Sequence, residues 1–477
     1  MRRTKIIATL GPATDDPVTL GKLIAAGADV VRVNFSHGGA GYRERRVRMV
    51  REVAEKHGRF VAVLGDLQGP KIRIQRFRDG PVILTEGQPF VLDSGLDPDG
   101  GSVAGVGVAY PALSRDVSPG DVLLLDDGFI TLTVERVAGT AIHCVVTQGG
   151  RLADNKGINK QGGGLSAPAL TDKDREDVKR AAELGVDWLA VSFVRQAEDL
   201  HEARALLEEA GGSARLVAKI ERAEAIANLE SIIDAADAVM VARGDLGVEM
   251  GYAGLTGLQK KILKMTRVRH KVAITATQML ESMIHSQVPT RAEVSDIANA
   301  VMDGTDAVML SAETAVGEHP VRAVATMAEV CVGAESYYLT LGRPNHRNDD
   351  RFHAVDEAIA MAVMYTANHL HVSAIIALTE SGSTPLWMSR IRSDIPIFAF
   401  TRHETTQRRV VMYRGVYPVP FDITHTDVER IYQEVFRLLL AKGHVREGDL
   451  VIVTKGELSG VAGRTNSLQI LSVTRDP

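Results

Sequence analysis

The stretch DVVRVNFSHG, residues 29–38, contains the unit from which most of the chain is built. Its valines and phenylalanine alternate with Arg32, Asn34 and Ser36, which places apolar and polar side chains on opposite faces of a strand. The apolar face can pack under helices and leave the polar face at an open end. Alternatively, the strand runs out into a polar loop, and this stretch alone is compatible with both interpretations.

The same unit occurs eight times. A short β-branched run ends in polar residues, and an amphipathic helical stretch follows most of the runs, for example residues 171–185. Eight alternating strand and helix units predict a closed parallel (β/α)8 TIM barrel. The runs are TKIIATLGP (4–12), DVVRVNFSHG (29–38), FVAVLGDLQG (60–69), DWLAVSFV (187–194), RLVAKIE (215–221), AVMVARGDLG (238–247), KVAITATQM (271–279) and AVMLSAETAVG (307–317).

Two other regions differ from this strand and helix pattern. Residues 72–167 alternate short strands with glycine-rich turns, which predicts a small β-barrel domain inserted at the barrel mouth. The polar stretch 341–351 predicts a linker, and the segments beyond it, three helical and three extended, predict an α/β sandwich. The expected domains are a barrel in two parts (1–71 and 168–340), the insert, and a C-terminal domain (341–477).

Composition excludes several classes of protein. The formal net charge of −5 over 477 residues argues against a general nucleic-acid binder. No segment approaches the length of a membrane span, and the N-terminal apolar run is too short for a signal peptide core. Cys144 and Cys331 lie far apart and give no disulfide framework, so a cytoplasmic location without membrane or nucleic-acid partners is expected.

The fifth and sixth runs carry carboxylates at their ends. Lys219 and Glu221 are two residues apart and should both face the barrel lumen, and Asp245 lies between two glycines. Two carboxylates from neighbouring strands suit magnesium, which takes few protein ligands. The alternative is that they simply pair with Lys219 and Arg243. Because six strand ends are polar in the same way, the metal site is favoured.

The last two runs place hydroxyls and another carboxylate at the same end, in Thr277, Ser311 and Glu313. A metal, a lysine, an arginine and a hydroxyl would form an electrostatic trap for an anionic substrate. Phosphoryl transfer needs alignment and charge neutralisation, and enolate chemistry needs a metal and a cation at the oxygen. The residues are compatible with both reactions.

Several motifs, in this order along the chain, resemble those of the pyruvate kinase family. That family transfers the phosphoryl group of phosphoenolpyruvate to ADP, giving ATP and the enolate of pyruvate, which is then protonated. The resemblance implies a glycolytic enzyme, a mobile lid formed by the insert, and a homotetramer. The motifs are TKIIATLGPAT, VRVNFSHG, GDLQGPKIR, AKIE, MVARGDLGVE, ITATQMLESM and PTRAEVSDIANAVMDGTDAVMLSAETAVGEHP.

The resemblance also implies roles for residues at the strand ends. Glu221 and Asp245 would hold the magnesium ion, and Lys219 would lie beside the transferring phosphoryl group and the enolate oxygen. The backbone of Gly244 and Asp245, together with the Thr277 hydroxyl, would receive the substrate carboxylate.

Either Thr277 or a water held by Ser311 and Glu313 would donate the proton. Arg32 and Arg73 would bind phosphates.

The nucleotide would lie between Asn34 and His37, and Lys156 of the lid would reach its phosphates on closure. Lid closure would exclude water from the transfer. A rival reading is a magnesium-dependent lyase or mutase acting on pyruvate or phosphoenolpyruvate, which would need neither the lid nor Lys156. A sensor that has lost its site is disfavoured because the lysine, carboxylates and threonine are all present.

The stretch IIALTESGSTPLW, residues 375–387, predicts an effector site in the C-terminal domain. Hydroxyls and free amides at a helix start bind phosphate, and Pro385 suits the first helical position. An ordinary helix cap would explain one hydroxyl only. In the family that the chain resembles, this loop holds the phosphate of an allosteric sugar, and some members that bind fructose bisphosphate carry a basic residue near it. Because this chain has Glu380 there, the resemblance implies activation by a sugar monophosphate (or AMP) rather than by the bisphosphate. The effector residues are Thr379, Ser381, Gly382, Ser383 and Thr384.

A last expectation concerns potassium. Members of the family that need potassium tend to carry glutamate where this chain has Lys71. An ammonium there could offset Asp66 and replace the ion, so that potassium is not required. Alternatively, Lys71 points to solvent at the lid hinge and potassium binds as usual. The pocket matching the family's potassium site comprises Asn34, Ser36, Asp66 and the backbone of Leu67.

Overall fold

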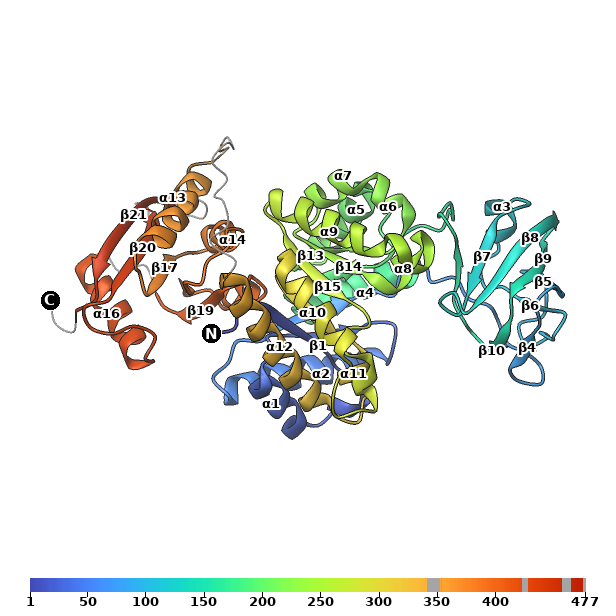
Figure 1. The fold of residues 1–477 in the computed structure, drawn as a ribbon, viewed down its shortest axis with the longest axis horizontal. Helices are drawn as coiled ribbons and strands as arrows, with labels where there is room; N and C mark the ends of the chain where they lie inside the picture. The colour runs from blue at the N-terminus through green and yellow to red at the C-terminus, as the bar shows by residue number, and fades with distance from the viewer. Residues whose placement is uncertain (341–351, 353, 423–427, 457–464, 475–477) are drawn as a thin grey trace.

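The computed structural model describes residues 1–340, 352, 354–422, 428–456 and 465–474. Its central region is a barrel, the inserted all-β region extends from one end of the barrel, and the C-terminal α/β region lies at the other end (Figure 1). The polar stretch expected to be a linker lies outside the described residues.

Eight parallel strands close the barrel in the order β1-β16-β15-β14-β13-β12-β3-β2. Each lies inside one of the eight runs, so the predicted TIM barrel is confirmed. The strands are β1 (Lys5–Thr9), β2 (Val30–Asn34), β3 (Ala62–Asp66), β12 (Trp188–Val191), β13 (Arg215–Ile220), β14 (Ala238–Ala242), β15 (Val272–Ala276) and β16 (Ala307–Leu310).

Helices cover the outside of this barrel, and their apolar faces bury the outward-pointing strand residues, among them Val31 and Val33. Thr171 and Thr290 begin two of the helices with capping boxes, because each accepts a hydrogen bond from the amide three residues on. The helices are α1 (Pro17–Ala26), α2 (Ala40–Lys56), α4 (Asp172–Glu183), α5 (Ala197–Glu209), α6 (Ala223–Ala227), α7 (Leu229–Ala235), α8 (Arg243–Met250), α9 (Tyr252–Val268), α10 (Arg291–Asp303), α11 (Ala312–Ala315) and α12 (Pro320–Thr340).

The amino-terminal end of the barrel packs on the C-terminal region. Residues inside the barrel form one apolar cluster with residues of that region, including Met388 and Met412. A buried ion pair joins Arg390 to Asp306, which directly precedes β16. The barrel is therefore closed at this end, and its carboxyl end remains for chemistry.

The inserted region contains a six-stranded sheet in the order β11-β7-β8-β9-β5-β6 and a two-stranded sheet of β10 and β4. Phe90 and Leu132 are fully buried in its separate apolar core. The elements are β4 (Val82–Leu84), β5 (Pro89–Asp93), β6 (Gly105–Gly107), α3 (Leu113–Asp116), β7 (Val122–Leu125), β8 (Ile130–Ala138), β9 (Ala141–Gln148), β10 (Gly150–Leu152) and β11 (Ile158–Lys160).

The C-terminal region is a five-stranded sheet in the order β19-β18-β17-β20-β21, with β21 antiparallel and helices packed beside it (Figure 1). The predicted α/β sandwich is confirmed, and α15, β19 and β21 are additions that the sequence did not indicate. The elements are α13 (Val355–His369), β17 (Ala374–Leu378), α14 (Ser383–Ser389), β18 (Ile397–Thr401), α15 (Glu404–Val410), β19 (Val416–Pro420), α16 (Val428–Ala441), β20 (Leu450–Gly456) and β21 (Thr465–Ser472).

Two local expectations were wrong. Strand β14 ends at Ala242, so Asp245 lies in the first turn of α8 rather than at a strand end. Pro385 is the third residue of α14, not the first, since this helix begins at Ser383. Proline is tolerated there because amides of the first turn have no acceptor within the helix.

Candidate active site

A buried network of alternating charge lies at the carboxyl end of the barrel. Lys219, from β13, places its Nζ atom 3.0 Å from Oε1 of Glu221 and 3.3 Å from Oδ1 of Asp66. Arg32, from β2, places Nε 2.6 Å from the other oxygen of Asp66. The expectation that Lys219, Glu221 and Arg32 converge at the barrel mouth therefore agrees with the geometry.

Charge pairing sets the ionisation of this network. Burial lowers the pKa of Lys219, but the Asp66 and Glu221 carboxylates outweigh it and hold that pKa above its ordinary value. Burial raises the pKa of Asp66, and the neighbouring Lys219 and Arg32 cations bring it below its usual range. The lysine is thus held as an ammonium ion and the aspartate as a carboxylate.

Ser192 completes the network and was not singled out from the sequence. Its Oγ accepts a hydrogen bond from Lys219 Nζ over 2.7 Å and donates to the carbonyl oxygen of Leu67 over 2.8 Å. It directly follows β12, so the rule applied to the other strand ends would have identified it. The serine fixes the direction in which the ammonium group points.

The two carboxylates expected to hold magnesium are electrostatically coupled. Burial raises the pKa of Glu221, Lys219 lowers it and Asp245 raises it, with a net upward shift. Two close carboxylates of which one is partly exposed fit a divalent cation that completes its shell with water and ligand oxygens. Within the described residues no group of three or more His, Cys, Asp or Glu side chains could form a metal cage.

The alternative that Glu221 and Asp245 simply pair with Lys219 and Arg243 holds for Glu221 only. Glu221 pairs with Lys219, but Arg243 pairs with Asp296 Oδ2 over 2.6 Å. Asp245 instead accepts a hydrogen bond from Lys71 Nζ over 3.2 Å.

The structure therefore places Lys71 differently from both sequence interpretations. Its side chain is 27% exposed and ion-paired, so it does not simply point to solvent. It does not offset Asp66, because that carboxylate is occupied by Arg32 and Lys219. The chain turns away from Asp66 at Gly69, which has a φ of 67°, and Lys71 reaches the neighbouring carboxylate.

Oxygens of the predicted monovalent-cation pocket also have protein donors. Oδ1 of Asn34 accepts from the amide of Ser36 over 2.9 Å, and the carbonyl of Leu67 accepts from Ser192. His37 is exposed beyond the end of β2.

Thr277 directly follows β15 and has a φ of 74°, a conformation that β-branched residues rarely adopt. Gly244 faces it so closely that a Cβ atom on the glycine would lie 2.9 Å from Thr277 Cγ2. The carboxylate of Glu313 accepts hydrogen bonds from the backbone amides of Ser311 (2.6 Å) and Leu280 (3.0 Å).

The loop between β7 and β8 brings the inserted region to the barrel mouth, because Asp127 Oδ1 lies 4.0 Å from Lys71 Nζ. Within the inserted region, Lys156 Nζ pairs with Asp126 Oδ1 over 2.8 Å, and Arg73 donates to the carbonyl oxygen of Asn155 over 2.8 Å. Two of the three predicted phosphate-binding cations, Arg73 and Lys156, are therefore held by other residues of the inserted region.

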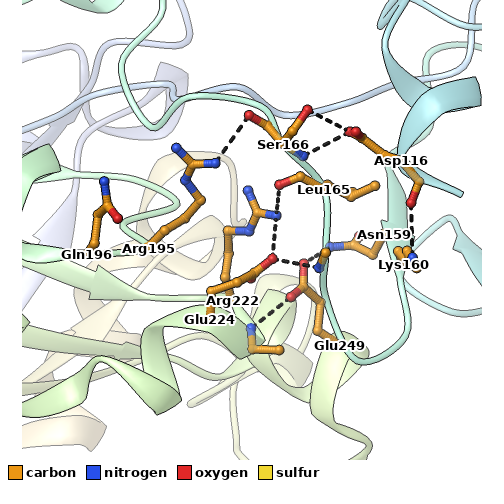
Figure 2. Close-up of polar contacts among 12 residues, drawn as sticks. Asp116, Asn159, Lys160, Leu165, Ser166, Arg195, Gln196, Arg222, Glu224 and Glu249 are labelled. Atoms are coloured by element: carbon orange, nitrogen blue, oxygen red, sulfur yellow. Dashed lines mark hydrogen bonds and ion pairs between the residues drawn. The ribbon is translucent and has the colours of Figure 1, made fainter.

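Figure 2 shows where the lid returns to the barrel. Arg222 donates to the carbonyl oxygen of Leu165 over 2.7 Å, and Glu249 accepts from the amide of Ala223 over 2.9 Å. Burial raises the pKa of Glu249 to about 7. Arg222, the residue before α6, therefore bonds the lid segment, and Asn159 Nδ2 of β11, 3.5 Å from Glu249 Oε1, joins it to α8, the helix that carries Asp245.

The predicted effector residues lie together after β17, with Thr379, Ser381 and Gly382 in the connecting loop and Ser383 and Thr384 in the first turn of α14. Thr379 Oγ1 accepts from the amide of Gly382 over 2.9 Å, Ser381 and Ser383 hydroxyls are 3.1 Å apart, and Thr384 bonds Thr465 over 2.6 Å. The adjacent carboxylate, that of Glu380, pairs with Arg402 and His403.

A closed (β/α)8 barrel with a lysine between two carboxylates at its carboxyl end, and a lid inserted beside it, defines an enzyme of charge-stabilised phosphoryl or enolate chemistry. Family models narrow this class: "Pyruvate kinase, barrel domain" matches residues 1–324 and "Pyruvate kinase, alpha/beta domain" matches residues 357–471. The chain belongs to the pyruvate kinase family.

Named relatives agree along nearly the whole chain. "Pyruvate kinase II" of Salmonella typhimurium is 54% identical over 477 residues, covering 99% of each chain. "Pyruvate kinase" of Haemophilus influenzae is 51% identical over 96% of each chain. "Pyruvate kinase" of Geobacillus stearothermophilus is 41% identical over 98% of this chain and 80% of its own.

The enzyme is a phosphotransferase of glycolysis that transfers the phosphoryl group of phosphoenolpyruvate to ADP, giving pyruvate and ATP. The alternative of a lyase or mutase is not supported. The family is generally magnesium-dependent. No helix among the described residues is long and apolar enough to cross a membrane.

Proposed function

We propose that the buried network around Lys219 is the centre at which the phosphoryl group is transferred. The observation that carries this proposal is the Lys219 ammonium, fixed by Ser192 between Glu221 and Asp66 at the open end of the barrel. A fixed cation there offsets the charge that develops on the moving phosphoryl group and on the enolate oxygen. Arg32, held by Asp66, binds the phosphate of phosphoenolpyruvate.

Substrate binding and protonation are proposed for the neighbouring strand ends. The backbone amides of Gly244 and Asp245, at the start of α8, and the Thr277 hydroxyl receive the substrate carboxylate. The P–O bond of phosphoenolpyruvate breaks as an oxygen of ADP bonds to phosphorus, and the enolate that leaves takes a proton at its methylene carbon. Thr277 delivers this proton directly or through a water.

Glu221 and Asp245 would hold magnesium. When bound, the ion supplies positive charge to the phosphate and enolate oxygens. Lys71, which donates a hydrogen bond to Asp245, adds a fixed ammonium group beside this carboxylate. We propose that this charge makes potassium unnecessary. Protein donors already engage the oxygens of the predicted potassium pocket, which supports this proposal.

Nucleotide binding is proposed for Asn34, His37, Arg73 and Lys156. Phosphates of ADP would take the place of Asp126 on Lys156 and of the Asn155 carbonyl on Arg73 when the lid closes. Closure excludes water, which would otherwise intercept the phosphoryl group.

Regulation is proposed to act through the loop after β17 and the first turn of α14, where four hydroxyls and Gly382 would bind the phosphate of a sugar monophosphate. Glu380 occupies Arg402 and His403, so these two side chains are not available to a second phosphate. We further propose a homotetramer in the cytoplasm, on the resemblance to the family. The four hydroxyl residues are Thr379, Ser381, Ser383 and Thr384.

The test is a coupled assay of pyruvate formation from phosphoenolpyruvate, with and without ADP and magnesium. Pyruvate should form only when both are present. Pyruvate formation without ADP would contradict the assignment of ADP as acceptor, and turnover without magnesium would contradict the roles of Glu221 and Asp245.

A further inference from the structure

The backbone that carries Thr277 is strained. Thr277 has a φ of 74° and Gln278 a φ of 53°, so two consecutive non-glycine residues lie in the left-handed region directly after β15. This conformation is costly, above all for a β-branched residue, and it persists only where surrounding contacts hold it.

One side chain provides such contacts. Arg243 donates from Nε to the carbonyl oxygen of Ala276 (3.2 Å) and from Nη2 to the carbonyl oxygens of Thr277 (2.7 Å) and Gln278 (3.3 Å). Three successive carbonyls thus converge on a single guanidinium. Only arginine offers several donors in a fixed plane, so lysine could not reproduce this set of bonds.

The arginine is itself anchored. It is 8% exposed, and its Nη1 atom lies 2.6 Å from Oδ2 of Asp296 on α10, which balances its charge. The same nitrogen lies 3.5 Å from Oε1 of Gln259 on α9. The guanidinium is therefore fixed from the helical side and presents its remaining donors to the strand end.

Arg243 also precedes the segment that faces Thr277. Gly244 and Asp245 follow it in the chain, and there is no room for a Cβ atom between Gly244 and the Thr277 methyl group. Arg243 therefore adjoins one wall of the proposed carboxylate pocket through the chain and bonds the other wall through its side chain.

We infer that Arg243 is a positioning residue that holds Thr277 in its left-handed conformation and so keeps the threonine hydroxyl at the substrate. The inference rests on the role proposed above for Thr277. Arg243 touches no reacting atom in this account. Its effect on turnover should therefore pass through Thr277 alone.

The experiment is a double-mutant cycle of Arg243→Lys and Thr277→Ala in the full-length enzyme with magnesium. Arg243→Lys keeps the charge beside Asp296 but cannot span three carbonyls, so kcat should fall by about tenfold to a hundredfold. The KM for ADP should stay unchanged. Exchange of the pyruvate methyl protons with solvent deuterium, followed by NMR, should slow in parallel. Arg269→Lys, on the barrel surface, is the control and should behave as the native enzyme.

The deciding result is the change in kcat that Arg243→Lys causes when the Thr277 hydroxyl is absent. In the Thr277→Ala background, Arg243→Lys should cause no further loss of kcat, because the arginine acts through the missing hydroxyl. Full additivity, or native kcat in Arg243→Lys, would overturn the inference and leave the role of Thr277 intact. Near-native turnover in Thr277→Ala would overturn that role and the inference together.

A second variant covers the case in which Arg243→Lys does not fold. Asp296→Asn leaves the guanidinium in place but releases its anchor at a half-exposed position. It should lower kcat by less than Arg243→Lys, and again only while Thr277 is present. Additive losses in this cycle would also overturn the inference.

Discussion

The Nζ atom of Lys71 lies 3.2 Å from Oδ1 of Asp245, across 174 positions of sequence. The barrel mouth thereby gains an ammonium group beside a carboxylate proposed to hold magnesium. Two cations from other strands, Arg32 and Lys219, balance Asp66. The positive charge at the mouth is thus divided between Lys71, beside Asp245, and the pair Arg32 and Lys219, beside Asp66.

The first prediction follows from this charge. Native enzyme should be almost fully active in sodium- and potassium-free buffer with a bulky organic counter-ion. Lys71→Glu should lose on the order of tenfold of its activity there and recover it with potassium, because a carboxylate replaces the fixed cation. Steady-state rates over a potassium titration measure both effects.

Lys71→Gln is the matched control, since it removes the cation without adding a carboxylate. It should lose activity and recover less of it with potassium than Lys71→Glu. A native enzyme that is nearly inactive until potassium is added would refute ammonium substitution.

The second prediction concerns the effector. At low phosphoenolpyruvate, glucose 6-phosphate, ribose 5-phosphate or AMP should activate the enzyme, and fructose 1,6-bisphosphate should not. Ser383→Ala should weaken activation because one phosphate donor is lost, while basal activity stays the same. Activation by the bisphosphate alone is the outcome that contradicts the proposal.

Much of this site could be predicted from strand ends, because β-branched runs indicate strands and the barrel fixes where they end. Contacts between distant segments could not be predicted in this way, and the hydrogen bond from Lys71 to Asp245 is the clearest example. Asp245 was misplaced because the glycine-rich start of α8 has low helix propensity, which packing against the barrel overrides. Strand β19 was missed because it contains Pro418 and Pro420, and it is an edge strand, where proline is tolerated.

The third prediction uses Glu249 at the lid junction. Its pKa is raised to about 7 because burial penalises the charged form, whereas the unfolded chain titrates near 4.5. The folded state therefore binds this proton more tightly. Its contribution to the free energy of unfolding falls as pH rises from about 4.5 to about 7, by on the order of 3 kcal/mol.

Glu249→Gln keeps an acceptor for the Ala223 amide and cannot ionise. Its melting temperature relative to the native enzyme should therefore increase between pH 5 and pH 8 (roughly the range in which a shifted carboxyl titrates). Parallel pH profiles for native enzyme and Glu249→Gln would show that Glu249 does not titrate there.

In the proposed mechanism the Lys219 ammonium stabilises the charge that moves with the phosphoryl group. The most direct measurement is kcat of Lys219→Met, with magnesium and phosphoenolpyruvate binding measured on the same sample. Lys5→Met is a matched control, because Lys5 is also buried but lies at the closed end of the barrel, where it donates to the carbonyl oxygen of Val416. We expect a loss of about a thousandfold in kcat for Lys219→Met with both ligands still bound, and no comparable loss for folded Lys5→Met. Near-native turnover of folded Lys219→Met would contradict it.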